Sequence, residues 1–461
     1  MYITLISFIL FGAFVLQYKA LKNKFDIVDV HIFMSVVYFG VWPLVVIYFD
    51  PNSYIFDSWL LVKSSLIILS SLSILWVINF IFSNSKGFSY YKEFVNFDNF
   101  IEKTKKISDK KILILVFALI AFMTYSYLKF GITKAFSSFD LSQEGITLPV
   151  WFLVIYSSIR FLIFCTVAIL SVKLISNKNK KNFKLILSFL LILILSLIFG
   201  RVSILSSLLV FLFFYIKINN IHFFSFRLIK KIIILSILGY LAVNFFQNIR
   251  SAFLSPTVYS DESSSAEVLI DEIDKLTIND ILVPDKQVES LLTRPSVSKF
   301  NVMILDWQSN FYISENTPYG GFLIDVFKMM IPRFLWKDKP ENNFQQNFLF
   351  PTYGQTYSKF QAPSLVGYTI ADFGVLSFLI MPIIFFGLIC ITLVFARIFK
   401  SSDSSYLILF LSIFYSLISV EANYDSYVMN LRNALFFAIT LIFLSICKKL
   451  FVSSISVKSK Q

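Results

Sequence analysis

Residues 185–216 have the sequence LILSFLLILILSLIFGRVSILSSLLVFLFFYI, and the interpretation of this stretch decides how the chain is built. A helix needs about 20 apolar residues to cross the ~30 Å hydrocarbon core of a bilayer. The stretch is too long for one such helix and too short for two full ones, and Gly200-Arg201 lies at its centre. If the stretch is one long helix, every later segment lies on one side of the membrane. If it is two short helices, the same segments lie on the other side.

The composition of the chain is that of a membrane protein. Of its 461 residues, 57% are hydrophobic and only 15% are charged, and the mean hydropathy is +0.74. Soluble domains are about 45–50% apolar and about 25% charged, so a water-soluble fold is excluded. The other apolar runs of spanning length lie at about 2–18, 27–49, 60–82, 112–130, 150–172, 232–247, 373–396, 405–420 and 431–447.

Lysine and arginine counts decide between one and two helices, because short cytoplasmic loops carry the positive excess. Upstream of 185–216, three alternate loops hold 15 Lys and Arg residues and the two loops between them hold one, so we expect the N-terminus outside. With two helices in 185–216, the three later loops on the cytoplasmic side hold ten more. The sequence therefore predicts an all-α polytopic protein with about eleven transmembrane helices and a cytoplasmic C-terminus. The loops counted as cytoplasmic are 19–26, 83–111, 173–184, 217–231, 397–404 and 448–461.

This topology predicts three parts: an N-terminal bundle of about eight helices (1–247), an external segment (248–372), and about three C-terminal helices with a tail (373–461). The external segment holds eight of the 12 prolines and 15 of the 28 acidic residues. Loops of this length without a function of their own are uncommon. Within it, Ser263–Lys275 predicts an exposed helix, and Gly321–Trp336 predicts a helix at the membrane interface.

Charge and ligand-type residues exclude several classes of function. The formal charge of +13 divides into +19 on the cytoplasmic loops and −5 on the external segment, so it reports topology and predicts no nucleic-acid partner. The two histidines are far apart, and the three cysteines lie within or at the end of apolar runs. Neither Asp-x-Asp nor a P-loop occurs. We therefore expect no metal and no cofactor.

Cations near the external helix ends are candidate ligands for phosphate, because a guanidinium fork matches two phosphate oxygens. Each one alone could equally be an interfacial anchor, and both interpretations stay open. Arg160 lies about ten residues into 150–172, near mid-depth, where a structural pairing with hydroxyls or with Asp29 is the alternative. Lys63 and Lys129 lie near span ends, where snorkelling explains them. The external cations are Arg201, Arg250, Arg294, Arg333, Lys337, Lys339 and Arg432.

Three short motifs point to a family. Residues 331–340, IPRFLWKDKP, contain the pattern P-R-x-x-W-x-x-K-P, with Pro332, Arg333, Trp336, Lys339 and Pro340 as its fixed positions. The second is the Gly200-Arg201-Val202-Ser203 turn, and the third is GYTIADFG at 367–374. In their order and membrane side, the three resemble motifs of Wzy-type oligosaccharide repeat-unit (O-antigen) polymerases. Two positions depart from the family pattern: the Ser before Arg201 is missing, and Tyr368 stands where the family often has Glu.

The resemblance implies a GT-C-like glycosyltransferase in the bacterial inner membrane, with its active site facing the periplasm. Its substrates would be undecaprenyl-diphosphate-linked oligosaccharides, and membrane lipids, a chain-length regulator and a flippase would be its partners. Catalysis would involve Asp372 as general base together with Arg333 and Arg201. Asp306 and Glu315 are alternative bases, and N-capping of the 373–396 helix is the alternative role of Asp372. The diphosphate ligands would be Arg201, Arg250, Arg333, Arg160, Arg294 and Lys339.

Two other functions fit the general layout. An O-antigen ligase of this architecture relies on a histidine in its external loop, and residues 248–372 contain none. A lipid-linked oligosaccharide flippase or polysaccharide transporter would show paired halves, whereas one external loop here outweighs the others. The repeat-unit polymerase is therefore the function that the sequence predicts.

Overall fold

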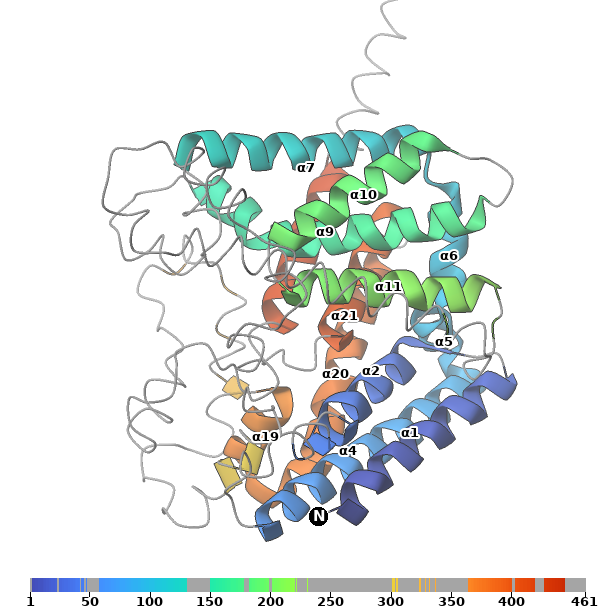
Figure 1. Ribbon diagram of the computed structural model, residues 1–461, viewed down its shortest axis with the longest axis vertical. Coiled ribbons are helices and arrows are strands. Elements are labelled where there is room, and N and C mark those ends of the chain that lie inside the picture. Colours follow the sequence, from blue (N-terminus) through green and yellow to red (C-terminus); the bar gives the residue numbers. More distant parts are fainter. Residues whose placement is uncertain are drawn as a thin grey trace, which may run out of the picture. The chain divides into compact units, whose positions relative to one another are not determined.

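A computed structural model describes residues 2–22, 25–41, 58–130, 150–177, 182–198, 201–219, 364–399, 403–418 and 427–443, with a few isolated residues elsewhere. Within these ranges every regular element is a helix, and the single β-type pairing is an isolated bridge between Asp26 and Asn96. The predicted all-α class is confirmed (Figure 1).

The apolar helices are compatible with a membrane location. Among the described residues, three are long and apolar enough to cross a bilayer: Trp59–Asn84, Ser158–Ser176 and Leu365–Ile398. Six shorter apolar helices accompany them. Several carry apolar side chains that are exposed on one face, such as Ile3, Leu10 and Phe14 of the first helix. Exposed apolar area is unfavourable in water, at about 25 cal/mol per Å², and suits lipid surroundings. The count of eleven spans and the GT-C-like arrangement stay predictions.

The chain packs as two compact units, residues 1–100 with 293–461 (unit 1) and residues 101–292 (unit 2). The predicted division at 247 and 372 follows the membrane boundaries rather than this packing, and it stays a prediction. The described part of unit 1 contains these helices: α1 (Tyr2–Lys22), α2 (Ile27–Val36), the π-helical η1 (Val37–Val41), α4 (Ser58–Asn84), η3 (Lys86–Phe88), α5 (Ser89–Val95), the start of α6 (Phe97–Lys106), α19 (Leu365–Phe373), η7 (Gly374–Leu376), α20 (Ser377–Ile398), α21 (Asp403–Ile418) and a helix at 427–443.

Helices α1, α2 and α4 lie side by side in unit 1 (Figure 1). Two glycines allow α1 to approach the α2–η1 helix closely. A methyl group at Gly12 would lie 2.8 Å from Val36 Cγ1, and one at Gly40 would lie 2.7 Å from Phe8 Cβ. Helix α20 packs on α4, where Ser71 Oγ donates to the Phe378 carbonyl at 3.2 Å.

Residues 83–111, predicted only as a cytoplasmic loop, contain the helices α5 and α6. Phe97 and Phe100 on α6 are fully buried and pack against α21. Their ring centroids lie 5.0 Å from Phe414 and 4.8 Å from Phe410, respectively. The apolar positions of α6 recur at helical spacing, so this short helix buries one face on its neighbour and exposes its lysines.

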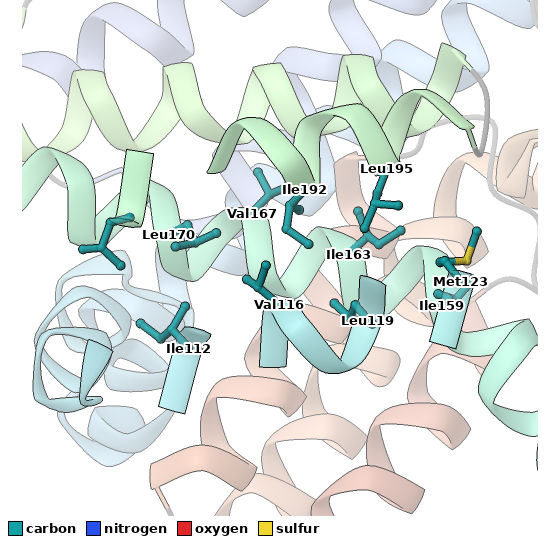
Figure 2. Close-up of a cluster of buried hydrophobic side chains, with 11 residues drawn as sticks. Ile112, Val116, Leu119, Met123, Ile159, Ile163, Val167, Leu170, Ile192 and Leu195 are labelled. Carbon is teal, nitrogen blue, oxygen red and sulfur yellow. The ribbon is translucent and has the colours of Figure 1, made fainter. Parts of the chain in front are cut away.

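Unit 2 contains the end of α6 and the helices α7 (Asp109–Phe130), α9 (Val150–Ser176), α10 (Phe183–Ile198) and α11 (Arg201–Asn219). The prediction of two helices in 185–216 is confirmed, since α10 ends at Ile198 and α11 begins at Arg201. Both pack on α9. Figure 2 shows the core that α7, α9 and α10 share, built from Ile, Leu, Val and Met side chains with at most 9% exposure.

A buried lysine near the end of α9 forms an ion pair with the first residue of α7. Lys173 Nζ lies 3.2 Å from Asp109 Oδ1 and donates to the Lys105 carbonyl at 3.0 Å. Its side chain is only 10% exposed, so the ion pair with Asp109 compensates part of the cost of burying the charge.

Candidate functional site

Helix α19 carries the third sequence motif and has well-defined ends. Ser364 precedes it in extended conformation, and its Oγ accepts the Gly367 N–H at 3.1 Å, as an N-cap residue does. At the other end Gly374 has φ 56°, a conformation that side chains with a Cβ rarely adopt. Eight of the nine residues of α19 are buried. The long apolar stretch Leu365–Ile398 is therefore a broken helix, with α19 before the break and α20 after it.

Asp372 lies in the last turn of α19, next to the break, and is only 4% exposed. Its Oδ2 accepts the backbone N–H of Leu323 at 3.0 Å. The sequence motif thus places a buried carboxylate against a residue 49 positions earlier, within the same predicted external segment.

The alternative role of Asp372 as the N-cap of a helix at 373–396 is wrong. Helix α20 begins at Ser377, and Leu376 occupies its N-cap position without a side-chain hydrogen bond. The physical reason is the break at Gly374, because Asp372 consequently belongs to the C-terminal end of the preceding helix.

The other end of α19 contacts residues near 301, also within the predicted external segment. Asn301 is fully buried, and Val302, Ile304 and Leu305 are each at most 1% exposed. Ser364 Oγ donates to Asn301 Oδ1 at 3.5 Å. Neither Asn301 nor Ser364 was a site candidate from sequence. The only sequence signal for Ser364 is a capping residue before an apolar run.

Arg160 is exposed on α9, whereas its neighbours Ile159 and Phe161 are buried. In Figure 2, Ile192 of α10 lies beside Val167 of α9, and Leu195 lies beside Ile163, so the two helices run antiparallel. Arg160 comes three residues before Ile163, and the end of α10 comes three residues after Leu195.

At a rise of 1.5 Å per residue, the three residues from Ile163 to Arg160 and the three from Leu195 to the end of α10 cover the same distance. Arg160 therefore lies at the same height along the helix axes as the end of α10. Arg201 begins α11 three residues later along the chain. Unit 2 therefore brings two of the predicted diphosphate ligands, Arg160 and Arg201, to the same level of one bundle. The structure describes the backbone of Arg201 and not its side chain.

Arg432 is half-buried in the helix at 427–443, and its guanidinium donates to Asn433 Oδ1 at 3.5 Å. The other candidates lie outside the described residues, and their roles stay predictions. They are Arg250, Arg294, Arg333 and Lys339, the alternative bases Asp306 and Glu315, the turn at 199–200, and the predicted helix Ser263–Lys275. Of the predicted interfacial helix Gly321–Trp336, only residues 323, 324, 328, 331 and 336 are described.

His31, Asp26 and Asp29 form hydrogen bonds that explain them as structural residues. His31 Nδ1 lies 2.9 Å from the Leu417 carbonyl, which can only accept, so this nitrogen carries the proton. Asp26 and Asp29 form a reciprocal capping box at the start of α2. Among the described residues, no group of three His, Cys, Asp or Glu side chains is arranged to hold a metal ion.

Comparison of the chain with known protein families, with curated proteins and with solved structures gives no match.

Proposed function

We propose that this protein polymerises lipid-linked oligosaccharide repeat units at the periplasmic face of the bacterial inner membrane. It transfers the growing glycan from undecaprenyl diphosphate to a hydroxyl of an incoming lipid-linked unit, without a metal. The observation that carries the proposal is Asp372, a buried carboxylate at the break of a long apolar helix, which accepts the backbone N–H of Leu323. It lies inside one of the three motifs that resemble those of repeat-unit polymerases.

In the proposed reaction Asp372 accepts the proton of the acceptor hydroxyl. The hydroxyl oxygen forms a bond to the anomeric carbon of the donor glycan, and the bond from that carbon to the diphosphate breaks. Undecaprenyl diphosphate leaves with the electron pair. A carboxylate that is held in place and shielded from water suits this role, since proton transfer by a positioned group contributes typically 10²–10⁴-fold to a rate.

Fixed arginines stabilise the charge that develops on the leaving diphosphate. Arg160 and Arg201 support this part of the proposal, because helices α9, α10 and α11 bring them to one level of unit 2. An arginine remains charged in any surroundings, so it provides this stabilisation without a metal ion. Arg333, Arg250, Arg294 and Lys339 are the further ligands in the proposal.

The test is elongation by the purified full-length protein in detergent, supplied with lipid-linked repeat units and no divalent metal. We expect products that grow by whole repeat units, and we expect Arg201→Ala and Arg333→Ala each to abolish them at unchanged protein levels. Arg397→Ala is the matched control, because Arg397 is exposed on α20 and stacks over the ring of Tyr90 at 5.7 Å.

Three outcomes would overturn the proposal. Long polymer made by both arginine variants would remove the arginines from the mechanism. Transfer of the glycan only to a lipid A core would identify a ligase. Binding or movement of the lipid-linked unit without any new glycosidic bond would identify a transporter.

A further inference from the structure

Asn301 carries a buried hydrogen-bond donor without an acceptor. The residue has 0% exposure, and no acceptor among the described residues lies within hydrogen-bonding distance of its Nδ2. A buried donor without a partner is unfavourable, because the amide has lost its water and gained nothing in exchange. Such groups are rare in folded proteins, and each one requires an explanation.

The amide group of Asn301 lies at the N-terminus of α19. Its Oδ1 accepts from Ser364 Oγ at 3.5 Å, and Ser364 is the N-cap residue of that nine-residue helix. Ser364 Oγ accepts the Gly367 N–H, so its own proton goes to Oδ1, and this orientation of the amide leaves Nδ2 as the atom without a partner. The first N–H groups of a helix carry partial positive charge and attract anions. Two kinds of donor therefore meet at this point.

Residues next to Asn301 and Ser364 in the chain are apolar and buried. Val302, Ile304, Leu365 and Val366 are each at most 3% exposed. In surroundings from which water is excluded, a donor and an anion interact more strongly than they do in water. The structure thus combines a buried amide donor without an acceptor, a helix N-terminus and buried apolar sequence neighbours.

We propose that Asn301 Nδ2 and the N-terminus of α19 bind a phosphate oxygen of a lipid diphosphate. The identity of the lipid rests on the proposed function, whereas the anion chemistry rests on Asn301 and α19 alone. This contact adds Asn301 and Ser364 to the site, and neither residue belongs to the arginine set.

The length of α19 indicates which of the two substrates binds here. Ser364 and Asp372 lie at opposite ends of the helix, about 12 Å apart along its axis at 1.5 Å per residue. The donor's diphosphate is bonded directly to the anomeric carbon that reacts, so it has to lie within a few bond lengths of the base. The acceptor's diphosphate is separated from its reacting hydroxyl by the sugars of the repeat unit. The Asn301 site therefore belongs to the acceptor.

Binding is measured on purified full-length protein with undecaprenyl diphosphate in detergent micelles, and with undecaprenol as the probe that lacks the phosphates. We expect Asn301→Leu to weaken binding of the diphosphate on the order of tenfold, since a hydrogen bond to a charged group is lost. Undecaprenol binding should not change. Asn301→Asp keeps the shape of the side chain, replaces the donor by a negative charge, and should weaken diphosphate binding further.

Thermal unfolding separates this role from a structural one. Replacing an unsatisfied amide by an apolar group of similar size should leave the melting temperature unchanged or raise it. The matched control is Asn79→Leu. Asn79 is also buried, but it donates to Asp26 Oδ2 and accepts from the Tyr91 hydroxyl, so this change should lower the melting temperature and leave binding unchanged.

The elongation assay keeps this proposal distinct from the proposed function. Asn301→Leu should raise the KM for single repeat units about tenfold with little change in kcat. Unchanged diphosphate binding in both Asn301 variants, or a lower melting temperature in Asn301→Leu, would overturn the site while leaving a polymerase. Diphosphate binding that depends on Asn301, in a protein that elongates nothing, would keep the site and overturn the polymerase.

Discussion

Asp372 shows how the surroundings of one side chain make it a candidate for a chemical role. It is nearly inaccessible to solvent, lies in the last turn of α19, and accepts one backbone N–H from Leu323. A positioned, partly desolvated carboxylate is what a general base requires. Among the described residues, Asp98 on α6 is by contrast an exposed carboxylate.

Asp372→Asn should lower the elongation rate at least 100-fold, because an amide cannot accept the proton of the acceptor hydroxyl. The amide oxygen still accepts the Leu323 N–H, so the fold should persist. The rate is measured with purified protein and lipid-linked repeat units. Asp98→Asn is the control and should elongate at the wild-type rate. An Asp372→Asn variant that is folded and equally fast would exclude this residue as the base.

Tyr91 is a second residue whose burial has a measurable effect, here on the stability of the protein at high pH. It lies on α5, outside the predicted spans, and its hydroxyl donates to Asn79 Oδ1 at 2.8 Å. Burial raises the pKa of Tyr91 well above its usual value of 10, and the nearby Asp26, Cys390 and Asp29 raise it further. The folded state therefore keeps the phenol protonated at pH values where the unfolded chain loses the proton.

A pKa that is higher in the folded state contributes stability that is complete below the unfolded pKa and is lost as pH rises above it. Thermal stability of the purified protein should thus fall as pH is raised above about 10. Tyr91→Phe should lose about 1 kcal/mol at neutral pH with the hydrogen bond, and show a weaker alkaline decline. Parallel pH profiles of the two proteins would argue against a protonated, buried Tyr91.

At the scale of elements, the break between α19 and α20 places the candidate base. Without it, residues 365–398 would form one helix about 50 Å long at 1.5 Å per residue, more than a bilayer needs. Gly374 at φ 56° permits the break, because the left-handed region is unfavourable for residues with a Cβ.

Gly374→Ala should lower the free energy of unfolding by about 1–2 kcal/mol, the cost of a side chain in the left-handed region. The elongation rate should fall with it, since Asp372 lies two residues away. Thermal unfolding and elongation are both measured. Gly387→Ala is the matched control on α20, where an added methyl meets nothing within 4 Å, and it should leave both unchanged or raise stability. Equal behaviour of the two variants would contradict a strained break at Gly374.

For the whole molecule, the apolar helices suit a membrane, and the loop charges predict which side each segment faces. The protein should therefore have its external segment in the periplasm. Single cysteines are introduced into a cysteine-free variant and labelled in cells with a maleimide that cannot cross the inner membrane. Ser263→Cys, in the external segment, should react. Ser85→Cys, exposed between α4 and η3, should react only after the inner membrane is opened. The reverse pattern would invert the topology.

The sequence by itself determined the helical class, the apolar spans of the described helices, and the separation of α10 from α11. These depend on composition and local periodicity, which act over a few turns of one helix. The first site signals were also local: a carboxylate in a short motif, and arginines at helix ends.

Only the tertiary structure decided which residues meet. The partner of Asp372 is 49 residues earlier, and that of Asn301 is 63 residues later. Phe100 in a predicted loop packs on Phe410 of α21. The break at Gly374, which moved Asp372 from a helix start to a helix end, depends on how α19 is buried. Burial and long-range hydrogen bonds are properties of packed elements, so no local pattern contains them.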